Sequence, residues 1–223
     1  MRRLLLATRN PKKLVELRRI LAAEVASVGL EVIGLDDVPR YPEAPETGAT
    51  FVENALLKAR EAARHSGLPA AADDSGLAVD ALNGMPGVLS ARWSGRGHDD
   101  ASNLRLVLDQ LADVPDDRRG AAFVCAAALV TPDGTEHVVE GRLDGVLVRQ
   151  PRGTGGFGYD PIFRPHGDTR TTAEMSAAEK DAISHRGRAF RALVPYILAT
   201  FRDPREPGAE GGSRTPTPEG TGS

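Results

Sequence analysis

Apolar residues in this chain form two kinds of pattern, short uninterrupted runs and stripes at helical spacing. The run at 3–7 predicts a buried strand, and a polar turn follows it. Leu14, Leu17 and Leu21 then recur at the spacing of a helix with one apolar face. Pro11 suits the first turn of that helix, because the N–H that proline lacks would have had no partner there.

The next elements are predicted from their ends. A second strand is expected over 31–34. Residues 50–53 have the spacing of a capping box, and the helix that follows is expected to end at Gly67. The apolar stretch 69–72 predicts a strand that leads into a turn, Asp-Asp-Ser-Gly, at 73–76. These carboxylates would lie at the carboxyl end of a strand, where open α/β sheets usually bind ligands.

The remaining pattern predicts a helix, a long hairpin and a helical end. A helix is expected over 100–112, and the runs at 121–130 and 136–148 flank a Pro-Asp-Gly turn typical of a hairpin. Capping-box spacing recurs at 176–179. Pro195 is expected to kink the last helix. The core face of that helix is marked by Phe190, Leu193, Val194, Ile197 and Phe201.

The composition changes near the end of the chain. Residues 203–223 are rich in Gly, Pro, Ser and Thr and contain no large apolar side chain. We therefore expect one α/β domain over 1–202 and a disordered polar tail over 203–223. A chain of 223 residues is long enough to bury a core of that kind.

The charge balance narrows the choice of ligands. Lysine and arginine total 28 against 31 aspartates and glutamates, so we expect neither a nucleic-acid nor a membrane partner. Cys125 is the only cysteine, which excludes an intrachain disulfide and fits a reducing, cytoplasmic location. The first apolar run ends at Thr8, far short of a membrane segment. Any anionic ligand must therefore be held by local groups.

The first candidate for chemistry is the polar loop that opens the first helix. Backbone N–H groups and the positive end of the helix dipole favour phosphate at such a place. An ordinary capped turn with solvated lysines explains the same pattern when it is considered alone. The members of the loop are Thr8, Arg9, Asn10, Pro11, Lys12 and Lys13.

The second candidate is the pair of adjacent carboxylates Asp73 and Asp74. Such a pair can hold Mg²⁺ and leave positions open for phosphate oxygens and water. Asp and Ser are also common in turns because they form local hydrogen bonds. Both interpretations stay open from the motif alone.

The third candidate is the glycine-rich stretch 153–158, which contains a formal G-x-G-x-x-G match. The dinucleotide-binding motif must open a helix, whereas Pro161 opposes helix here. A loop is the better interpretation, with Phe157 able to stack on a flat ring. The alternative is that Phe157, Tyr159 and Phe163 are core aromatics.

The fourth candidate places donors at the end of one short helix and the start of the next. The motif begins at Lys180, and His185 and Arg186 could donate to a base carbonyl; a solvated basic face is the alternative. The five histidines have no ligand spacing, so we expect no zinc site.

Taken together, the motifs resemble the inosine triphosphate pyrophosphatase family, which hydrolyses non-standard purine nucleoside triphosphates such as ITP, dITP and XTP to the monophosphate and pyrophosphate. The resemblance spans residues 4–189. It implies an elongated, two-lobed α/β fold with a curved mixed sheet, helices around it, an active-site cleft between the lobes and a homodimer. The resembling segments are LLLATRNPKK, ETGATFVENALLKA, ADDSGL, PGVLSARWSG, GTGGFGYDPIF and EKDAISHRGRA.

The resemblance also implies individual roles. Residues 8–13 would bind the triphosphate, and Glu46 and Asp74 would hold Mg²⁺. Asp74 would act as the general base that activates water, and Asp73 would either be linked to the metal or support its ligands from behind them. Attack at the α-phosphorus makes pyrophosphate the leaving group, whose developing charge needs a metal ion and cations beside it.

Two lysines and the later motifs complete the implied site. Lys13 and Lys58 would supply positive charge to the leaving group. Donors beside the base would select the 6-keto group of hypoxanthine and xanthine, because adenine would leave them unpaired. The implied substrate-binding residues beyond the first loop are Ser75, Phe157, Gly158, Tyr159, Asp160, Lys180, His185 and Arg186.

Two other functions use the same motifs. A regulator that binds a phosphorylated ligand without hydrolysing it would use the phosphate loop and the aromatic residue. The carboxylates at 46, 73 and 74 argue against it, because an anion binder gains little from negative charge unless a metal comes with it. A related pyrophosphatase that acts on modified pyrimidine or other nucleotides is the alternative enzyme.

Overall fold

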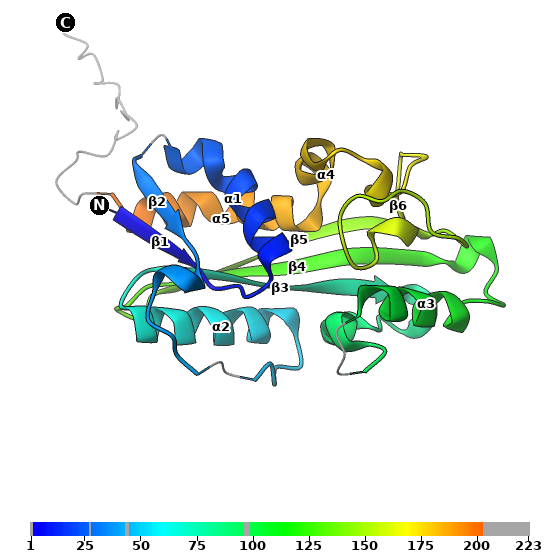
Figure 1. Cartoon of the computed structure of the whole chain (residues 1–223), viewed down its shortest axis with the longest axis horizontal. Coiled ribbons are helices and arrows are strands. Elements are labelled where there is room, and N and C mark those ends of the chain that lie inside the picture. The colour runs from blue at the N-terminus through cyan, green and yellow to red at the C-terminus, as the bar shows by residue number, and fades with distance from the viewer. Residues whose placement is uncertain (1, 27, 43–44, 96–98, 203–223) are drawn as a thin grey trace, which may run out of the picture.

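The computed structural model describes residues 2–26, 28–42, 45–95 and 99–202, and within them a long mixed sheet has helices on both faces (Figure 1). The six strands lie in the order β2-β1-β3-β4-β5-β6. Pairing of β1 with β2 and with β3 is parallel, and the remaining pairs are antiparallel. The expected α/β fold with a mixed sheet is confirmed. The strands are β1 (Arg2–Leu6), β2 (Leu30–Ile33), β3 (Ala70–Val79), β4 (Gly120–Val130), β5 (Glu136–Leu147) and β6 (Phe163–Pro165).

Helices α1 and α5 cover one face of the sheet, and α2 and α3 cover the other (Figure 1). No helix of the described ranges is both long and apolar enough to cross a membrane. The predicted tail, 203–223, lies outside the described residues. The helices are α1 (Pro11–Ala26), α2 (Phe51–Ser66), α3 (Asp100–Gln110), α4 (Ala177–Ile183) and α5 (His185–Thr200).

Most predicted elements are confirmed, and their ends show why. The Thr50 hydroxyl accepts from the N–H of Glu53 at 3.1 Å, and Gly67 ends α2 with a φ of 66°. The reciprocal half of that capping box is wrong, because the Glu53 carboxylate accepts from Ala49 N. The predicted box at 176–179 is present in full. Helix α5 continues through Pro195 to its end, with the predicted apolar face turned to the core.

The predicted turn at 73–76 is wrong. Strand β3 passes through all four residues and pairs with β4 along its whole length, from Ala70 opposite Val130 to Val79 opposite Ala121. Strand β1 pairs with β3 only at its last two residues. A complete ladder with β4 therefore overrides the local turn preference of Asp and Ser, and β3 extends alone past the end of β1.

Small side chains bring the helices close to this extended strand. Helix α2 packs its alanines against alanines of β3 and β4, so its backbone lies near the sheet. On the other face, α1 and α5 pack through larger residues such as Leu17, Leu21 and Phe190. A third cluster packs α3 against the second half of β3 and the neighbouring parts of β4 and β5. The alternation of side chains along β3 therefore divides the core into two faces.

Gly141 in β5 permits the close approach of α5. A Cβ at this position would lie 2.1 Å from the carbonyl oxygen of His185 and 2.6 Å from the nitrogen of Ala189. Both contacts are with backbone, which cannot move aside without shifting the start of α5. The position of α5 on the sheet thus depends on the absence of a side chain at residue 141.

We predict that Gly141→Ala lowers the free energy of unfolding by about 2 kcal/mol, because overpacking forces a backbone shift. Chemical denaturation measures the change. Glu140→Ala on the neighbouring exposed position is the matched control and should change it by less than about 0.5 kcal/mol. Equal effects of the two substitutions would contradict the account of this contact.

Candidate functional site

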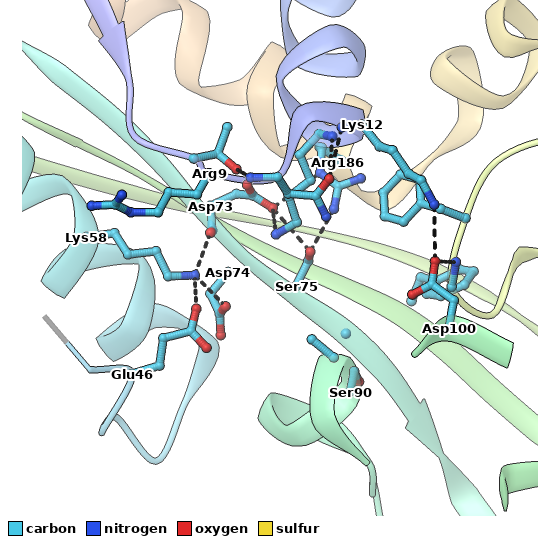
Figure 2. A pocket seen from close by; sticks show the side chains of 18 of the residues that line it. Arg9, Lys12, Glu46, Lys58, Asp73, Asp74, Ser75, Ser90, Asp100 and Arg186 are labelled. Carbon is cyan, nitrogen blue, oxygen red and sulfur yellow. Dashed lines mark hydrogen bonds and ion pairs between the residues drawn. The ribbon is translucent and has the colours of Figure 1, made fainter. Parts of the chain in front are cut away.

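A pocket of about 940 Å³ lies where β1 ends and β3 continues, and every predicted site residue lines it. Figure 2 shows side chains from the 8–13 loop, α2, β3 and the start of α5 converging there. Residues of the 3-10 turn at Gly87–Arg92 and of α3 line the opposite side. The structure therefore brings together residues that are far apart in the chain.

Asp73 is the buried centre of one face of this pocket. Its Oδ2 accepts from Lys13 Nζ at 2.9 Å, from Arg186 Nε at 3.2 Å and from the Ser75 hydroxyl at 3.1 Å. Burial would raise the pKa of Asp73, but the charges of Lys13, Arg186 and Lys58 lower it far below its usual range. Asp73 is therefore an ionised anchor for cations from α1 and α5.

Glu16 extends this network and was absent from the sequence prediction. Its Oε2 accepts from Arg186 Nη1 at 2.6 Å, while its Oε1 lies 3.9 Å from Lys180 Nζ. Arg186 Nη2 donates to the Ser75 hydroxyl at 2.7 Å. One signal was available, because Glu16 lies three residues after Lys13 and so on the same side of α1. The sequence alone does not distinguish it from a solvated helix glutamate.

Asp74 lies on the other face, against α2. Lys58 Nζ donates to Asp74 Oδ1 at 2.8 Å and to the Asp73 carbonyl oxygen at 3.1 Å, and lies 2.6 Å from Glu46 Oε1. Asn54 Nδ2 donates to Asp74 Oδ2 at 3.3 Å. Asn54 was missed, although it precedes Lys58 by four residues and so shares its helix face. Three partners match the three N–H donors of the Lys58 ammonium.

The carboxyl groups of this face titrate differently. Burial raises the pKa of Asp74 in spite of the nearby Lys58. Burial has the same tendency at Glu46, but Lys58 and the hydrogen bond from Arg92 outweigh it and lower the pKa of Glu46. Burial alone would lower the pKa of Lys58, but the negative charges of Asp74, Asp73 and Glu46 raise it. Of these two carboxyl groups, Asp74 is the one whose pKa lies above its usual value.

The loop at 8–13 differs from the prediction in one respect. The N–H groups of Lys12 and Lys13 are not free, because the Asn10 side chain accepts both, at 2.9 and 3.3 Å. The Thr8 hydroxyl in turn accepts from Asn10 N at 3.2 Å. These two contacts make Asn10 the cap of the helix, a position that asparagine often occupies. In this structure the loop therefore offers an anion its lysine side chains rather than those two amides.

The glycine-rich loop presents one aromatic ring to the pocket. Phe157 is partly exposed, and the cations of Lys180, Arg186 and Lys12 lie 4.9, 5.6 and 5.8 Å from its ring centroid. Tyr159 and Phe163 are buried in the third cluster, the one that includes α3, so the core interpretation is correct for these two. Phe157 remains available to stack on a ligand.

Asp160 holds that loop in shape. Its carboxylate accepts from Lys180 Nζ at 2.6 Å, from the Thr172 hydroxyl at 2.7 Å and from Phe157 N at 2.8 Å. A Cβ on Gly156, whose φ is 70°, would lie 2.0 Å from the same carboxylate. The glycine at this position therefore permits the turn and the contact together.

His185 is a buried polar group at the pocket wall. Its ring stacks on Phe123 with centroids 4.9 Å apart, and its Nδ1 has no hydrogen-bond partner among the described residues. Burial, together with Arg186 and Lys180, lowers the pKa of His185 well below its usual value. The imidazole is therefore neutral at physiological pH, with one nitrogen able to donate and the other to accept.

Asp100, at the start of α3, closes the pocket from the opposite side and was also missed. Its Oδ2 accepts from Lys12 Nζ at 3.3 Å and from Gly158 N at 3.1 Å (Figure 2). It lies at the N-terminus of a helix, where acidic residues are common for capping and dipole reasons alone. For that reason the sequence did not distinguish it.

Glu46 and Asp74 could hold a hard cation, because both line the pocket and both contact Lys58. Each has one carboxylate oxygen on Lys58, and the remaining oxygens accept from Arg92 and Asn54. Within the described ranges no three Asp, Glu, His or Cys side chains gather as a metal site. A two-carboxylate site fits Mg²⁺, which usually takes its other ligands from water and substrate phosphates.

The chain is similar to known proteins over most of its length. The model of the Ham1 family matches residues 4–196. A Nocardia farcinica protein named dITP/XTP pyrophosphatase is 63% identical over 199 residues, which cover 89% of this chain and 96% of the relative.

Two solved structures share the fold. A crystal structure of a nucleoside-triphosphatase, also named dITP/XTP pyrophosphatase, from Mycobacterium abscessus is 63% identical with a TM-score of 0.70, covering 86% of this chain and 99% of that one. A HAM1 protein from Coxiella burnetii is 41% identical with a TM-score of 0.79, covering 89% of this chain and 100% of that one.

We predict that Glu16→Gln lowers the free energy of unfolding by about 2 kcal/mol, because it weakens a buried hydrogen bond to the charged Arg186. Glu31→Gln is the matched control. The Glu31 pair with Arg3 is exposed, and its loss should change the free energy by less than about 0.5 kcal/mol. Denaturant titration of both variants decides the matter, and equal losses would show that the buried network has no special weight.

Proposed function

The chain belongs to the Ham1 family, and from this premise we propose that it hydrolyses non-standard purine nucleoside triphosphates (ITP, dITP and XTP) to the nucleoside monophosphate and pyrophosphate. This removes such nucleotides from the cellular pool. One observation carries the proposal. Lysines, the carboxylates of Glu46 and Asp74 and the partly exposed ring of Phe157, from distant parts of the chain, line a single pocket.

The lysines suit the phosphate end of a nucleotide. Lys13 and Lys58 both touch the Asp73–Asp74 stretch of β3, and Lys12 lies at the rim beside Asp100. Thr8, Arg9 and Asn10 line the same end of the pocket. When the α–β phosphoanhydride bond breaks, negative charge accumulates on the leaving pyrophosphate, and cations fixed in advance stabilise it.

We assign Mg²⁺ to Glu46 and Asp74. Both supply carboxylate oxygens, the ligands that Mg²⁺ prefers, and both line the pocket beside the lysines. When bound, the ion would neutralise phosphate charge and orient the triphosphate. Lys58 holds the two carboxylates close together, since its ammonium contacts both.

Asp74 is the proposed general base. It would accept a proton from a water molecule whose oxygen attacks the α-phosphorus, while the bond from that phosphorus to the bridging oxygen breaks and pyrophosphate leaves. Its raised pKa supports this role, because a carboxylate of higher pKa is a stronger base. Asp73 is ionised and holds Lys13 and Arg186, so it serves as their anchor rather than as a proton acceptor.

Phe157 and the donors around it suit a purine ring. The base would stack on Phe157, with Lys180 and Arg186 beside the ring and the neutral His185 at the wall. A 6-keto oxygen can accept from these donors, whereas the amino group of adenine cannot. The same pocket is also lined by Ser75, Gly158, Tyr159 and Asp160.

Three further assignments belong to the same proposal. Residues 1–202 form the catalytic unit, the protein acts in the cytoplasm, and it pairs as a homodimer. The single cysteine supports the location, since the fold uses no disulfide. Sedimentation analysis of the purified chain reports the oligomeric state directly.

We predict that the wild-type chain with Mg²⁺ converts dITP and XTP to monophosphate and pyrophosphate, at least about 100-fold faster than ATP.

Asp74→Asn should lose at least about 100-fold in kcat while still binding dITP, because the amide cannot accept the proton. Asp109→Asn, an exposed change on α3, is the control and should keep full activity. Release of orthophosphate, or turnover retained by Asp74→Asn, would contradict the assignment.

We predict an acid limb in the pH profile of kcat/KM. A base must be deprotonated to act, so activity should rise as pH passes through the raised pKa of Asp74, above the ordinary aspartate value of about 3.9. Lys58 lowers that pKa, so Lys58→Gln should move the limb to higher pH in its residual activity. A limb that stays in place or moves to lower pH would rule out Asp74 as the titrating group.

A further inference from the structure

The turn within PGVLSARWSG lines the pocket, but none of its residues has a role in the function proposed so far. Arg92 ends the 3-10 turn Gly87–Arg92 and is not among the residues that line the pocket. Its side chain contacts Glu46. Nη1 donates to Glu46 Oε2 at 3.0 Å, and Nη2 donates to the Glu46 carbonyl oxygen at 3.5 Å. One guanidinium thus contacts both the side chain and the backbone of a proposed metal ligand.

Glu46 depends on such outside support. The described residues between Asp37 and Phe51 form neither helix nor strand, so no regular backbone orients this side chain. Two cations hold its carboxylate, Lys58 at Oε1 and Arg92 at Oε2. Asp74, by contrast, is fixed by the ladder between β3 and β4. Of the two proposed metal ligands, Glu46 is the one whose position depends on side-chain contacts.

Arg92 is itself attached to a well-supported turn. The Ser90 hydroxyl accepts from Leu77 N at 2.9 Å, and the Ser90 carbonyl oxygen accepts from the Tyr159 hydroxyl at 2.9 Å. Asn103 Nδ2 donates to the Ala91 carbonyl oxygen at 3.1 Å. Strand β3, the loop before β6 and helix α3 therefore all fix the turn that carries Arg92.

We propose that Arg92 is a positioning residue that holds the Glu46 carboxylate beside Asp74, ready to receive the divalent cation. This inference rests on the proposed function, which assigns the cation to these two carboxylates. The planar fork of arginine can hold two acceptors at once, which a lysine ammonium on a flexible stem does less well. Arg92 orders Glu46 during folding, so that the side chain need not be ordered when the metal binds.

A second effect of Arg92 has the opposite sign, and this makes the proposal testable. Its positive charge near Glu46 repels a cation, so Arg92 acting only through charge would weaken metal binding. The positioning role predicts that removing Arg92 weakens metal binding. A purely electrostatic role predicts that removing it strengthens metal binding.

The test is titration of the full-length chain with Mn²⁺ alone, followed by calorimetry or by electron paramagnetic resonance of free Mn²⁺. We expect Arg92→Gln to raise the Mn²⁺ dissociation constant about 10-fold, the scale found for residues that orient metal ligands. Arg92→Lys keeps the charge with one point of contact and should fall between Arg92→Gln and the wild type. Arg60→Gln is the matched control, since it removes a two-point pair with Glu136 in which Glu46 takes no part, and it should leave the constant unchanged.

A second background shows whether Arg92 acts through Glu46. In Glu46→Gln, adding Arg92→Gln should produce no further weakening. Tighter or unchanged Mn²⁺ binding by Arg92→Gln, or a full effect in the Glu46→Gln background, overturns the proposal. Should Arg92→Gln fail to fold, Arg92→Lys decides, because an Arg92→Lys chain that binds Mn²⁺ as tightly as wild type overturns it too.

The proposed function can fail separately. A wild-type chain that binds no Mn²⁺ overturns the role of Arg92, whereas hydrolysis of dITP by the same preparation would leave the proposed function standing. Conversely, a chain that binds Mn²⁺ through Glu46 and Arg92 but hydrolyses no nucleotide supports the positioning role alone.

Discussion

The site depends on adjacent residues of a β-strand pointing to opposite faces of the sheet. Strand β3 continues past the end of β1, and at that point it carries Asp73 and Asp74 in succession. Asp73 meets cations from α1 and α5, whereas Asp74 meets Lys58 and Asn54 of α2. Because β1 stops there, the two faces open into one pocket. Two consecutive residues thereby connect the three helices that carry most of the site.

This arrangement buries a charged carboxylate, and neighbouring cations stabilise it. An ionised carboxylate as buried as Asp73 would be very costly alone, and several cations must converge on it. Of the cations that satisfy Asp73 and Asp74, Lys13 and Lys58 are the two that we propose to bind the triphosphate. Lys13 and Lys58 therefore stabilise the carboxylates of β3, and under the proposed function the same two ammonium groups also bind phosphate.

Local signals predicted the elements well because caps and apolar periodicity act over a few residues, as at Thr50, Gly67 and the apolar face of α5. The turn predicted at 73–76 was wrong, since pairing with β4 is a long-range contact that local preference does not encode. The resemblance brought Glu46 and Lys58 into the site. Glu16, Asn54 and Asp100 were missed because each resembles an ordinary helix residue until a distant partner is known.

We propose that the side chains lining the pocket bind a nucleotide and leave its α-phosphorus accessible to water. Hydrolysis of dITP by the wild-type chain in water enriched in oxygen-18, with mass analysis of both products, tests it most directly. We predict that the heavy oxygen appears in the deoxyinosine monophosphate and that the pyrophosphate stays unlabelled. Label in pyrophosphate or in orthophosphate would place the attack at another phosphorus and contradict the account.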